Sequence, residues 1–179
     1  YPGSKARLAS RIVALFPRHH AYLEPYLGSG AVFLNKPRSA LEVVNDKDGE
    51  LVNFFRVIRD HPEELARGIF WTPYARAELA NAATEAEPAG VESARRFAVR
   101  CWMSRLSPRD PHFRRDLNGV DLGSTWALLP EKVAAAAVRL RGVTIEQADA
   151  IDLIRSCTRS TLIYADPPYV GTNLYKTGM

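Results

Sequence analysis

The stretch HAYLEPYLGSGAVFLNKPRSALEVVND, residues 20–46, decides the fold. It begins with a short apolar strand at 20–25, turns through two glycines at 27–30 and enters a short helix at 31–36. A second apolar strand at 39–46 follows and ends in polar residues. A strand, a helix and another strand in this order are typical of an α/β protein with a parallel sheet.

The alternation of helix and strand extends on both sides of this stretch. Upstream, Ser4 is expected to cap a helix that ends before Pro17. The apolar face of that helix is predicted to contain Leu8, Ile12, Leu15 and Phe16. Downstream, either Asp46 or Asp48 caps the next helix. Its predicted buried face contains Leu51, Phe54, Phe55 and Ile58.

The strand pattern returns near the end of the chain. VTIEQ at 143–147 and TLIYAD at 161–166 are predicted strands, and the helical stretch DAIDLIRS joins them. Between the two α/β parts, residues 61–142 contain three predicted helices, a loop at 107–123 and a further helix between Pro130 and Gly142. We therefore predict a Rossmann-like α/β domain formed by residues 1–60 and 143–179, with a mostly helical insertion at 61–142.

Composition narrows the class of protein. The 179 residues are 46% hydrophobic and 25% charged, which is ordinary for a globular chain. No apolar run approaches the roughly 20 residues that cross a bilayer, and no leader pattern is present, so we expect no membrane segment. The two cysteines have no metal-ligand spacing, which favours a reduced, cytoplasmic protein. A formal charge of +4 permits a polyanionic partner without requiring one.

The glycine turn predicts a ligand site. Gly28 and Gly30 lie between a strand and a helix, where the backbone can approach a ligand closely. Phe33 stands where the third glycine of the dinucleotide fingerprint would be, which argues against pyrophosphate binding. Asp46 follows at the spacing of an acid that accepts ribose hydroxyls, and the alternative is that it is only a helix cap. A nucleoside-like ligand such as S-adenosylmethionine fits this pattern.

A second candidate site follows the last predicted strand, where the sequence reads DPPY at 166–169. Pro167 and Pro168 each fix φ and lack a backbone donor, so the segment is stiff. It carries the carboxylate of Asp166, free carbonyl groups and the ring of Tyr169. Such segments at strand ends are where binding and catalytic residues are often placed.

Four segments in this order resemble the Dam-type adenine-specific DNA methyltransferases: YPGSK at 1–5, EPYLGSGAVFLNK at 24–36, VNDKDGELVNFF at 44–55 and DPPY at 166–169. The resemblance covers about half of the chain. It implies a Rossmann-like methyltransferase sheet with a DNA target-recognition insertion, and S-adenosylmethionine as cofactor. The residues that match the cofactor motifs of the family are Tyr1, Gly3, Lys5, Gly28, Gly30, Asp46 and Asp166.

The DPPY motif implies the chemistry. Asp166 and the carbonyl of Pro167 would accept the two N–H groups of an extruded adenine amine, so that its lone pair faces the activated methyl group. Pro168 would keep this segment rigid, and Tyr169 would stack on the flipped base, which is worth about 1–3 kcal/mol. No metal is needed for this reaction. Relatives with the same motif methylate the cytosine amine, so that target stays an alternative.

The densest positive cluster lies in the insertion, and double-stranded DNA is the expected partner. The residues expected to contact DNA are Arg96, Arg100, Arg109, Arg114 and Arg115. The alternative is a solvated arginine face that pairs with Glu92 or Asp110.

Only three or four strands are accounted for, which is fewer than open sheets of this class usually carry. We therefore expect a further C-terminal segment or a second chain to complete the sheet. A truncated, catalytically inactive fragment that binds cofactor or DNA is the remaining alternative.

Overall fold

The computed structural model describes residues 4–84, 88–115, 119 and 121–168. The chain forms two compact units. Of the described residues, one unit contains 4–52 and 142–168, and the other contains those between 53 and 141. The division between them falls inside helix α3 (Gly49–Asp60).

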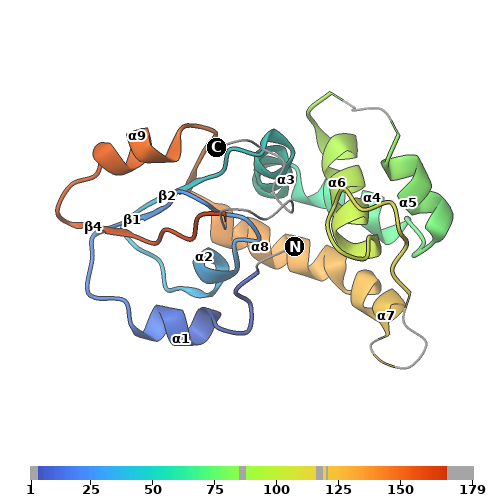
Figure 1. Ribbon diagram of the computed structural model, residues 1–179, viewed down its shortest axis with the longest axis horizontal. Helices are drawn as coiled ribbons and strands as arrows, with labels where there is room; N and C mark the ends of the chain where they lie inside the picture. Colours follow the sequence, from blue (N-terminus) through green and yellow to red (C-terminus); the bar gives the residue numbers. More distant parts are fainter. Residues whose placement is uncertain (1–3, 85–87, 116–118, 120, 169–179) are drawn as a thin grey trace. The chain divides into compact units, whose positions relative to one another are not determined.

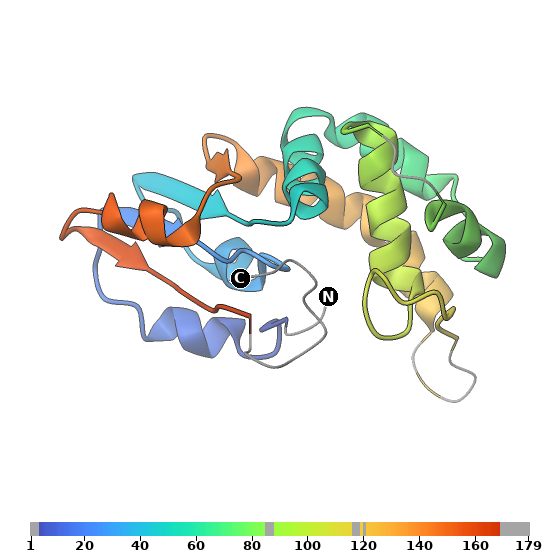
Figure 2. The same ribbon diagram turned by 45° about the horizontal axis from the view of Figure 1, so that its top comes forward.

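The first unit is built on a parallel sheet of four strands, β1 (Ala21–Glu24), β2 (Leu41–Asn45), β3 (Thr144–Glu146) and β4 (Thr161–Ile163). The strand order is β3-β2-β1-β4. The last strand therefore lies beside the first, with Ala21 opposite Thr161 and Leu23 opposite Ile163 (Figures 1 and 2). The predicted α/β class with a parallel sheet is confirmed.

Short helices cover both faces of this sheet. Helices α1 (Ala9–Ala14) and α2 (Ala31–Asn35) lie on one face, and α9 (Ala150–Arg155) lies on the other (Figure 1). The core of this unit is formed by large side chains that are almost completely buried: Tyr22, Val32, Phe33, Val44 and Leu51. A layered α/β arrangement follows, because the central strands β1 and β2 bury side chains on both faces.

The predicted start of α1 was wrong, and two residues of its expected apolar face are exposed. The N-cap is Leu8, which has no side-chain cap, and Ser4 instead contacts Ser29. Leu8 is 47% exposed and Leu15 is 83% exposed. The buried position is Ala9, whose small side chain lets α1 pack closely against α2. Ile12 and Phe16 are half-buried, so the other part of the expected apolar face does turn inward.

The start of α3 separates the two candidate capping residues. Asp48 Oδ1 accepts hydrogen bonds from the backbone N–H groups of Glu50 (3.0 Å) and Leu51 (3.5 Å). Asp48 is therefore the helix cap, and Asp46 has other partners. The predicted buried face of α3 is confirmed, with all four apolar residues at most 7% exposed.

The second unit is helical. It contains the remainder of α3 together with α4 (Pro62–Phe70), α5 (Arg76–Ala82), α6 (Val91–Met103), α7 (Leu122–Ala127) and α8 (Leu129–Leu140). The sequence predicted α4, α5, α6 and α8 but missed α7, which Asp121 caps through the N–H of Ser124 (2.9 Å). The indole N–H of Trp126 donates to the carbonyl of Thr72 (2.7 Å) and ties α7 to the end of α4.

Among the helices of the described residues, none has both the length and the apolar character that a bilayer-spanning segment requires.

Candidate cofactor and catalytic site

The turn after β1 has a conformation that selects glycine. Gly28 and Gly30 have φ values of 50° and 64°, in the left-handed region where residues with a Cβ are disfavoured. The N–H of Leu27 donates to the carbonyl of Asn45 (2.8 Å), and the N–H of Gly28 donates to Asp46 Oδ2 (2.9 Å). The turn is therefore fastened to the end of the neighbouring strand β2.

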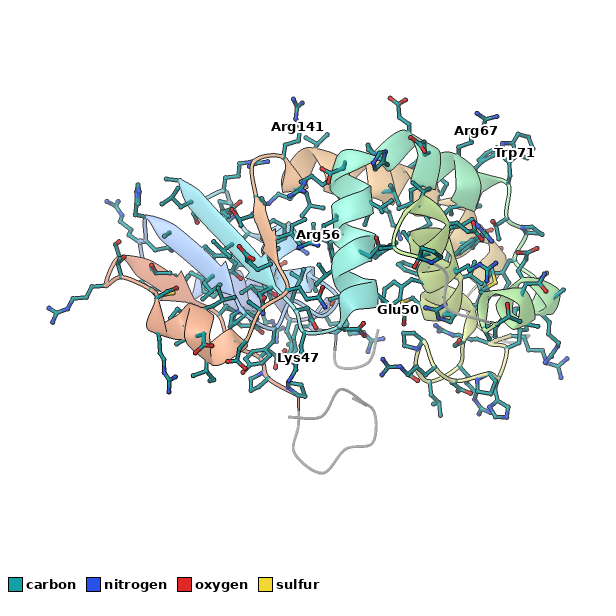
Figure 3. All side chains as sticks on the ribbon, turned by 90° about the horizontal axis from the view of Figure 1, so that it is seen from above. Lys47, Glu50, Arg56, Arg67, Trp71 and Arg141 are labelled. Atoms are coloured by element: carbon teal, nitrogen blue, oxygen red, sulfur yellow. The ribbon has the colours of Figure 1, made fainter. Side chains whose placement is uncertain are left out.

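Asp46 holds the turn through both carboxylate oxygens. Oδ2 accepts from Gly28, and Oδ1 accepts from the N–H of Asp48 (3.0 Å). Burial is the largest influence on this carboxyl and raises its pKa, while the backbone N–H groups oppose that effect. Lys47 lies in the turn that joins β2 to α3, Glu50 lies in the first turn of α3, and both are exposed (Figure 3). The carboxylate thus connects the glycine turn to the start of α3.

The acidic segment after β4 leaves the sheet beside β1. The N–H of Tyr164 donates to the carbonyl of Leu23 (2.9 Å), which extends the pairing of β4 by one residue. Asp166 follows and is half-buried, and its Oδ2 lies 2.6 Å from Lys5 Nζ. Pro167 is exposed and Pro168 is half-buried. The charge-assisted contact with Lys5 fixes one oxygen of the Asp166 carboxylate.

The segment before α1 connects the two parts of the candidate site. Ser4 Oγ lies 2.9 Å from Ser29 Oγ, between the two glycines of the turn, and the adjacent Lys5 pairs with Asp166. The structure therefore brings together Lys5, Gly28, Gly30, Asp46 and Asp166 at the carboxyl end of the sheet. Tyr1, Gly3 and Tyr169 lie outside the described residues.

This position is a topological switch point. From β1 the chain passes to β2 on one side, and β4 pairs with β1 on the other side. In open α/β sheets, ligands bind outside the carboxyl ends of the strands at such a point. The pairing of β1 with β4 could not be read from the sequence, and it explains why Asp166 and the glycine turn meet.

Sequence reasoning missed a buried acid in the same region. Glu24 is the last residue of β1 and is only 2% exposed. The hydroxyl of Tyr22 donates to its Oε2 (2.6 Å), and the N–H of Phe33 also donates to it. Burial raises the pKa of Glu24 to about 8, and the negative charge of Asp166 adds to this effect. The available signal was a tyrosine two positions before an acid in a strand, because such residues share a face.

A buried ion pair was missed as well. Lys36 Nζ lies 2.6 Å from Glu42 Oε1, and both side chains are at most 2% exposed. Lys36 also donates to Ser39 Oγ (2.9 Å) and lies 4.4 Å from the ring centre of Tyr22. This pair joins the end of α2 to β2 and is fully committed to internal partners.

In the helical unit, the two arginines expected on α6 have internal contacts. Arg96 Nε lies 2.9 Å from Glu92 Oε1, and Arg100 donates to the carbonyl of Ala82 (2.9 Å). Arg100 also lies over the ring of Phe97. Arg96 also donates to the carbonyl of Asn81 (3.5 Å), so each arginine bonds to the end of α5 and has a structural role.

The loop after α6 folds back on itself. Ser104 and Phe113 form an antiparallel bridge, and the N–H of Arg105 donates to the carbonyl of His112 (3.0 Å). Asp110 closes the loop by accepting from the N–H groups of Leu106 and His112. This arrangement leaves exposed the three arginines that were expected in the loop: Arg109, Arg114 and Arg115.

The parallel sheet, the glycine turn and the acids at its carboxyl end are consistent with a methyltransferase fold. The chain belongs to the D12 class N6 adenine-specific DNA methyltransferase family, whose sequence model matches residues 1–99. This confirms the resemblance drawn from the motifs, although residues 166–169 lie beyond the matched part.

Among curated proteins, the chain is similar to a type II methyltransferase from Lactococcus lactis subsp. cremoris. The two are 37% identical over 67 residues, which is 36% of this chain. The match spans 23% of the length of that relative.

Glu24 makes stability depend on pH in a defined direction. Its pKa rises from an ordinary 4.5 to about 8 on folding, so between these values the unfolded chain binds fewer protons than the folded one. The free energy of unfolding should therefore fall as pH rises, by at most about 1.4 kcal/mol per pH unit from this group. Urea unfolding at pH 5.5 and 7.5 measures the decline. In Glu24→Gln this contribution should be absent, and an unchanged pH dependence in that variant would contradict the assignment.

Proposed function

We propose that this chain contains the catalytic and cofactor-binding part of a site-specific DNA adenine methyltransferase. It transfers the methyl group of S-adenosylmethionine to the 6-amino group of an adenine that is flipped out of the duplex. The observation that carries the proposal is the connection from Asp166 through Lys5 and Ser4 to the glycine turn, and from Gly28 to Asp46. Family membership supports the same reaction class.

The donor set at the carboxyl end of the sheet suits a nucleoside-type cofactor. Gly28 and Gly30 present backbone without side chains, and Asp46 supplies a carboxylate at the end of β2 for the ribose hydroxyls. Lys5 and Asp166 border the same place, and Tyr1 and Gly3 belong to this set by their motif. When bound, S-adenosylmethionine supplies a methyl group already activated on a positively charged sulfur.

The chain must then orient the adenine amine. The amine lone pair is delocalised into the ring, and two acceptors on its N–H groups favour a pyramidal nitrogen. Asp166 and the carbonyl of Pro167 are these acceptors. Lys5 holds one oxygen of Asp166 and leaves the other to the substrate. Pro167 and Pro168 keep the segment stiff, and Tyr169 stacks on the base. Holding both reactants in line supplies roughly 7–11 kcal/mol of the barrier.

The helical unit is the proposed target-recognition part, corresponding to the insertion expected at 61–142. Within it, the loop closed by Asp110 is the main candidate for phosphate contacts because Arg109, Arg114 and Arg115 are exposed there. Arg96 and Arg100 contribute to the positive field from α6 while they hold the helices together.

The broader setting is part of the proposal. Action on DNA, two free cysteines and the type II relative fit a cytoplasmic enzyme of a restriction-modification system. Within the described residues, β4 pairs with β1 alone. We propose that a further segment or a second chain adds strands at that edge.

Calorimetry with S-adenosylmethionine, followed by methylation of duplex DNA and digestion to nucleosides, tests the function. The expected results are cofactor binding and the appearance of N6-methyldeoxyadenosine. If the methyl group were found on the cytosine amine instead, cytosine and not adenine would be the target base. Binding without any methylated nucleoside would favour the inactive fragment.

Removing two loop arginines should weaken DNA binding and make it less dependent on salt concentration. In Arg114→Ala with Arg115→Ala, two phosphate contacts are lost, so the slope of log K against log salt should flatten by about 1.8 for duplex DNA. Binding measured by fluorescence anisotropy at several salt concentrations gives this slope. Arg155→Ala with Arg159→Ala is the charge-matched control outside the helical unit and should keep the parental slope. An unchanged slope in the loop variant would place the DNA contacts elsewhere.

A further inference from the structure

The carboxyl groups of Asp166, Glu42 and Glu24, which lie in or directly after the strands of the sheet, have very different partners. Asp166 pairs with Lys5, and Glu42 pairs with Lys36. Glu24 is almost completely buried, and within the described residues it has no lysine, arginine or histidine nitrogen at ion-pair distance. Its hydrogen-bond donors are neutral, namely the hydroxyl of Tyr22 and the N–H of Phe33.

The ionisable groups around Glu24 do not supply the missing charge. Lys36 exerts a favourable but indirect effect, because its ammonium is bound to Glu42, Ser39 and a backbone carbonyl. Asp166 repels an ionised Glu24. The groups that act on Glu24 directly are Tyr22 on β1, Asp166 after β4 and Lys36 after α2. These groups have further neighbours: Tyr164, Glu42 and His19 lie near Tyr22, Glu42 pairs with Lys36, and Lys5 pairs with Asp166.

A buried carboxyl in this state responds strongly to a new positive charge. Burial holds the pKa of Glu24 at about 8, so the group is mostly protonated near neutral pH. An opposite charge within a few ångströms lowers the pKa of a carboxyl by about one to three, and burial keeps solvent from screening that effect. A cation that enters the neighbouring site would therefore convert Glu24 from the neutral to the ionised form.

We propose that Glu24 gives up its proton when S-adenosylmethionine binds and regains one when the methyl group has left. This inference rests on the proposed function. The amino-acid end of the cofactor carries both an ammonium and a carboxylate, which balance, so the sulfonium is its net charge. In the transfer, the carbon–sulfur bond breaks and its electron pair stays on sulfur, which becomes neutral. The carbon–nitrogen bond forms as the amine loses one proton to the solvent, and Glu24 takes up one proton from the solvent.

The charge balance of the site follows from this exchange. One positive charge disappears from sulfur and one proton is released by the amine, so reprotonation of Glu24 keeps the total charge of the site constant. Glu24 acts through the electric field of the site and need not contact the cofactor. It distinguishes the cofactor from its demethylated product by charge, because only the former carries the sulfonium.

Calorimetry in buffers with different ionisation enthalpies measures the protons released on binding. At pH 7.5, S-adenosylmethionine should release roughly half to three quarters of a proton per molecule bound, and S-adenosylhomocysteine should release much less. Glu24→Gln keeps a hydrogen-bond acceptor for Tyr22 and should remove the release. Glu146→Gln, a half-buried acid on β3, is the matched control and should behave as the parent.

A titration of the free protein gives a second readout. In protein labelled with 13C at glutamate carboxyl carbons, one resonance should titrate near pH 8 and be absent in Glu24→Gln. Tyr22→Phe removes a donor that favours the ionised form, so this titration should move to higher pH. If Glu24→Gln does not fold, the shift in Tyr22→Phe still tests whether the titrating group is Glu24.

The outcomes separate the two proposals. If neither ligand binds, the cofactor assignment and this inference both fail. If both ligands bind and Glu24→Gln releases as many protons as the parent, or if the two ligands release equally, only the role of Glu24 is overturned.

Discussion

Replacing Asp166 with alanine should reduce methyl transfer by at least about 100-fold, the scale of losing one preorganised electrostatic contact to a reacting group. The variant loses an acceptor for the adenine amine, while the loop arginines that are proposed to bind DNA are unchanged. The DNA dissociation constant should therefore stay within a few-fold of the parent. Transfer of a radiolabelled methyl group to duplex DNA and anisotropy with the same duplex measure the two quantities.

The loss in Asp166→Ala should not come from unfolding. Asp166 and Lys5 are both partly exposed, and such a pair contributes at most about 1 kcal/mol to stability. The melting temperature should accordingly stay close to that of the parent. Asp152→Ala, which removes a largely exposed carboxylate on α9, is the control and should keep full activity. Near-normal turnover in Asp166→Ala would refute the assigned role.

Replacing Lys36 with alanine should destabilise the protein by about 3–5 kcal/mol, because Glu42 would remain buried without its cation. For a chain of this size, that corresponds to a fall in melting temperature of roughly 10 °C. Urea denaturation followed by circular dichroism gives the free energy of unfolding.

Two further variants separate the buried charge from the loss of side-chain volume. Lys36→Met with Glu42→Leu removes both charges and keeps apolar volume, so its stability should return close to that of the parent. Arg155→Ala breaks an exposed ion pair with Asp152 and should change stability by less than about 1 kcal/mol. A double variant as unstable as Lys36→Ala would show that packing, and not the uncompensated carboxylate, causes the loss.

Much of the fold follows from local pattern. The four strands are apolar runs bounded by turn residues, and the glycine turn is dictated by a backbone conformation that other residues disfavour. The buried face of α3 follows from helical periodicity, and each of its apolar residues is indeed buried. These features depend on neighbours in the chain and are therefore visible in the sequence.

Other features depend on contacts between distant residues. Ser4 has the chemistry of a helix cap, yet its hydroxyl pairs with Ser29 because the first segment lies beside the glycine turn. Asp46 and Asp48 are equivalent in the sequence, and only the conformation of the turn assigns the cap to Asp48. The start of α1 and the residue that it buries could not be predicted, because they depend on how α1 packs against α2.

The candidate site shows the same division. Gly28, Asp46 and Asp166 can be recognised from motif and spacing, whereas the pairing of Lys5 with Asp166 requires the fold. Glu24 and the pair Lys36–Glu42 escaped notice because charged residues in a sequence are most often exposed. The contacts of Arg96 and Arg100 with α5 were equally out of reach, because they depend on how two helices pack.

The pairing of β1 with β4 has a consequence for folding during synthesis. This strand pair cannot form until Thr161, the partner of Ala21, has been synthesised about 140 positions later in the chain. At about 5–20 residues per second, the ribosome needs roughly 7–30 seconds to supply the missing partner. During that interval β1 and β2 can pair and the helical unit can fold, but one edge of β1 stays open. A nascent chain that stalls within this interval would expose an unpaired strand, which makes it a substrate for chaperones and prone to aggregation.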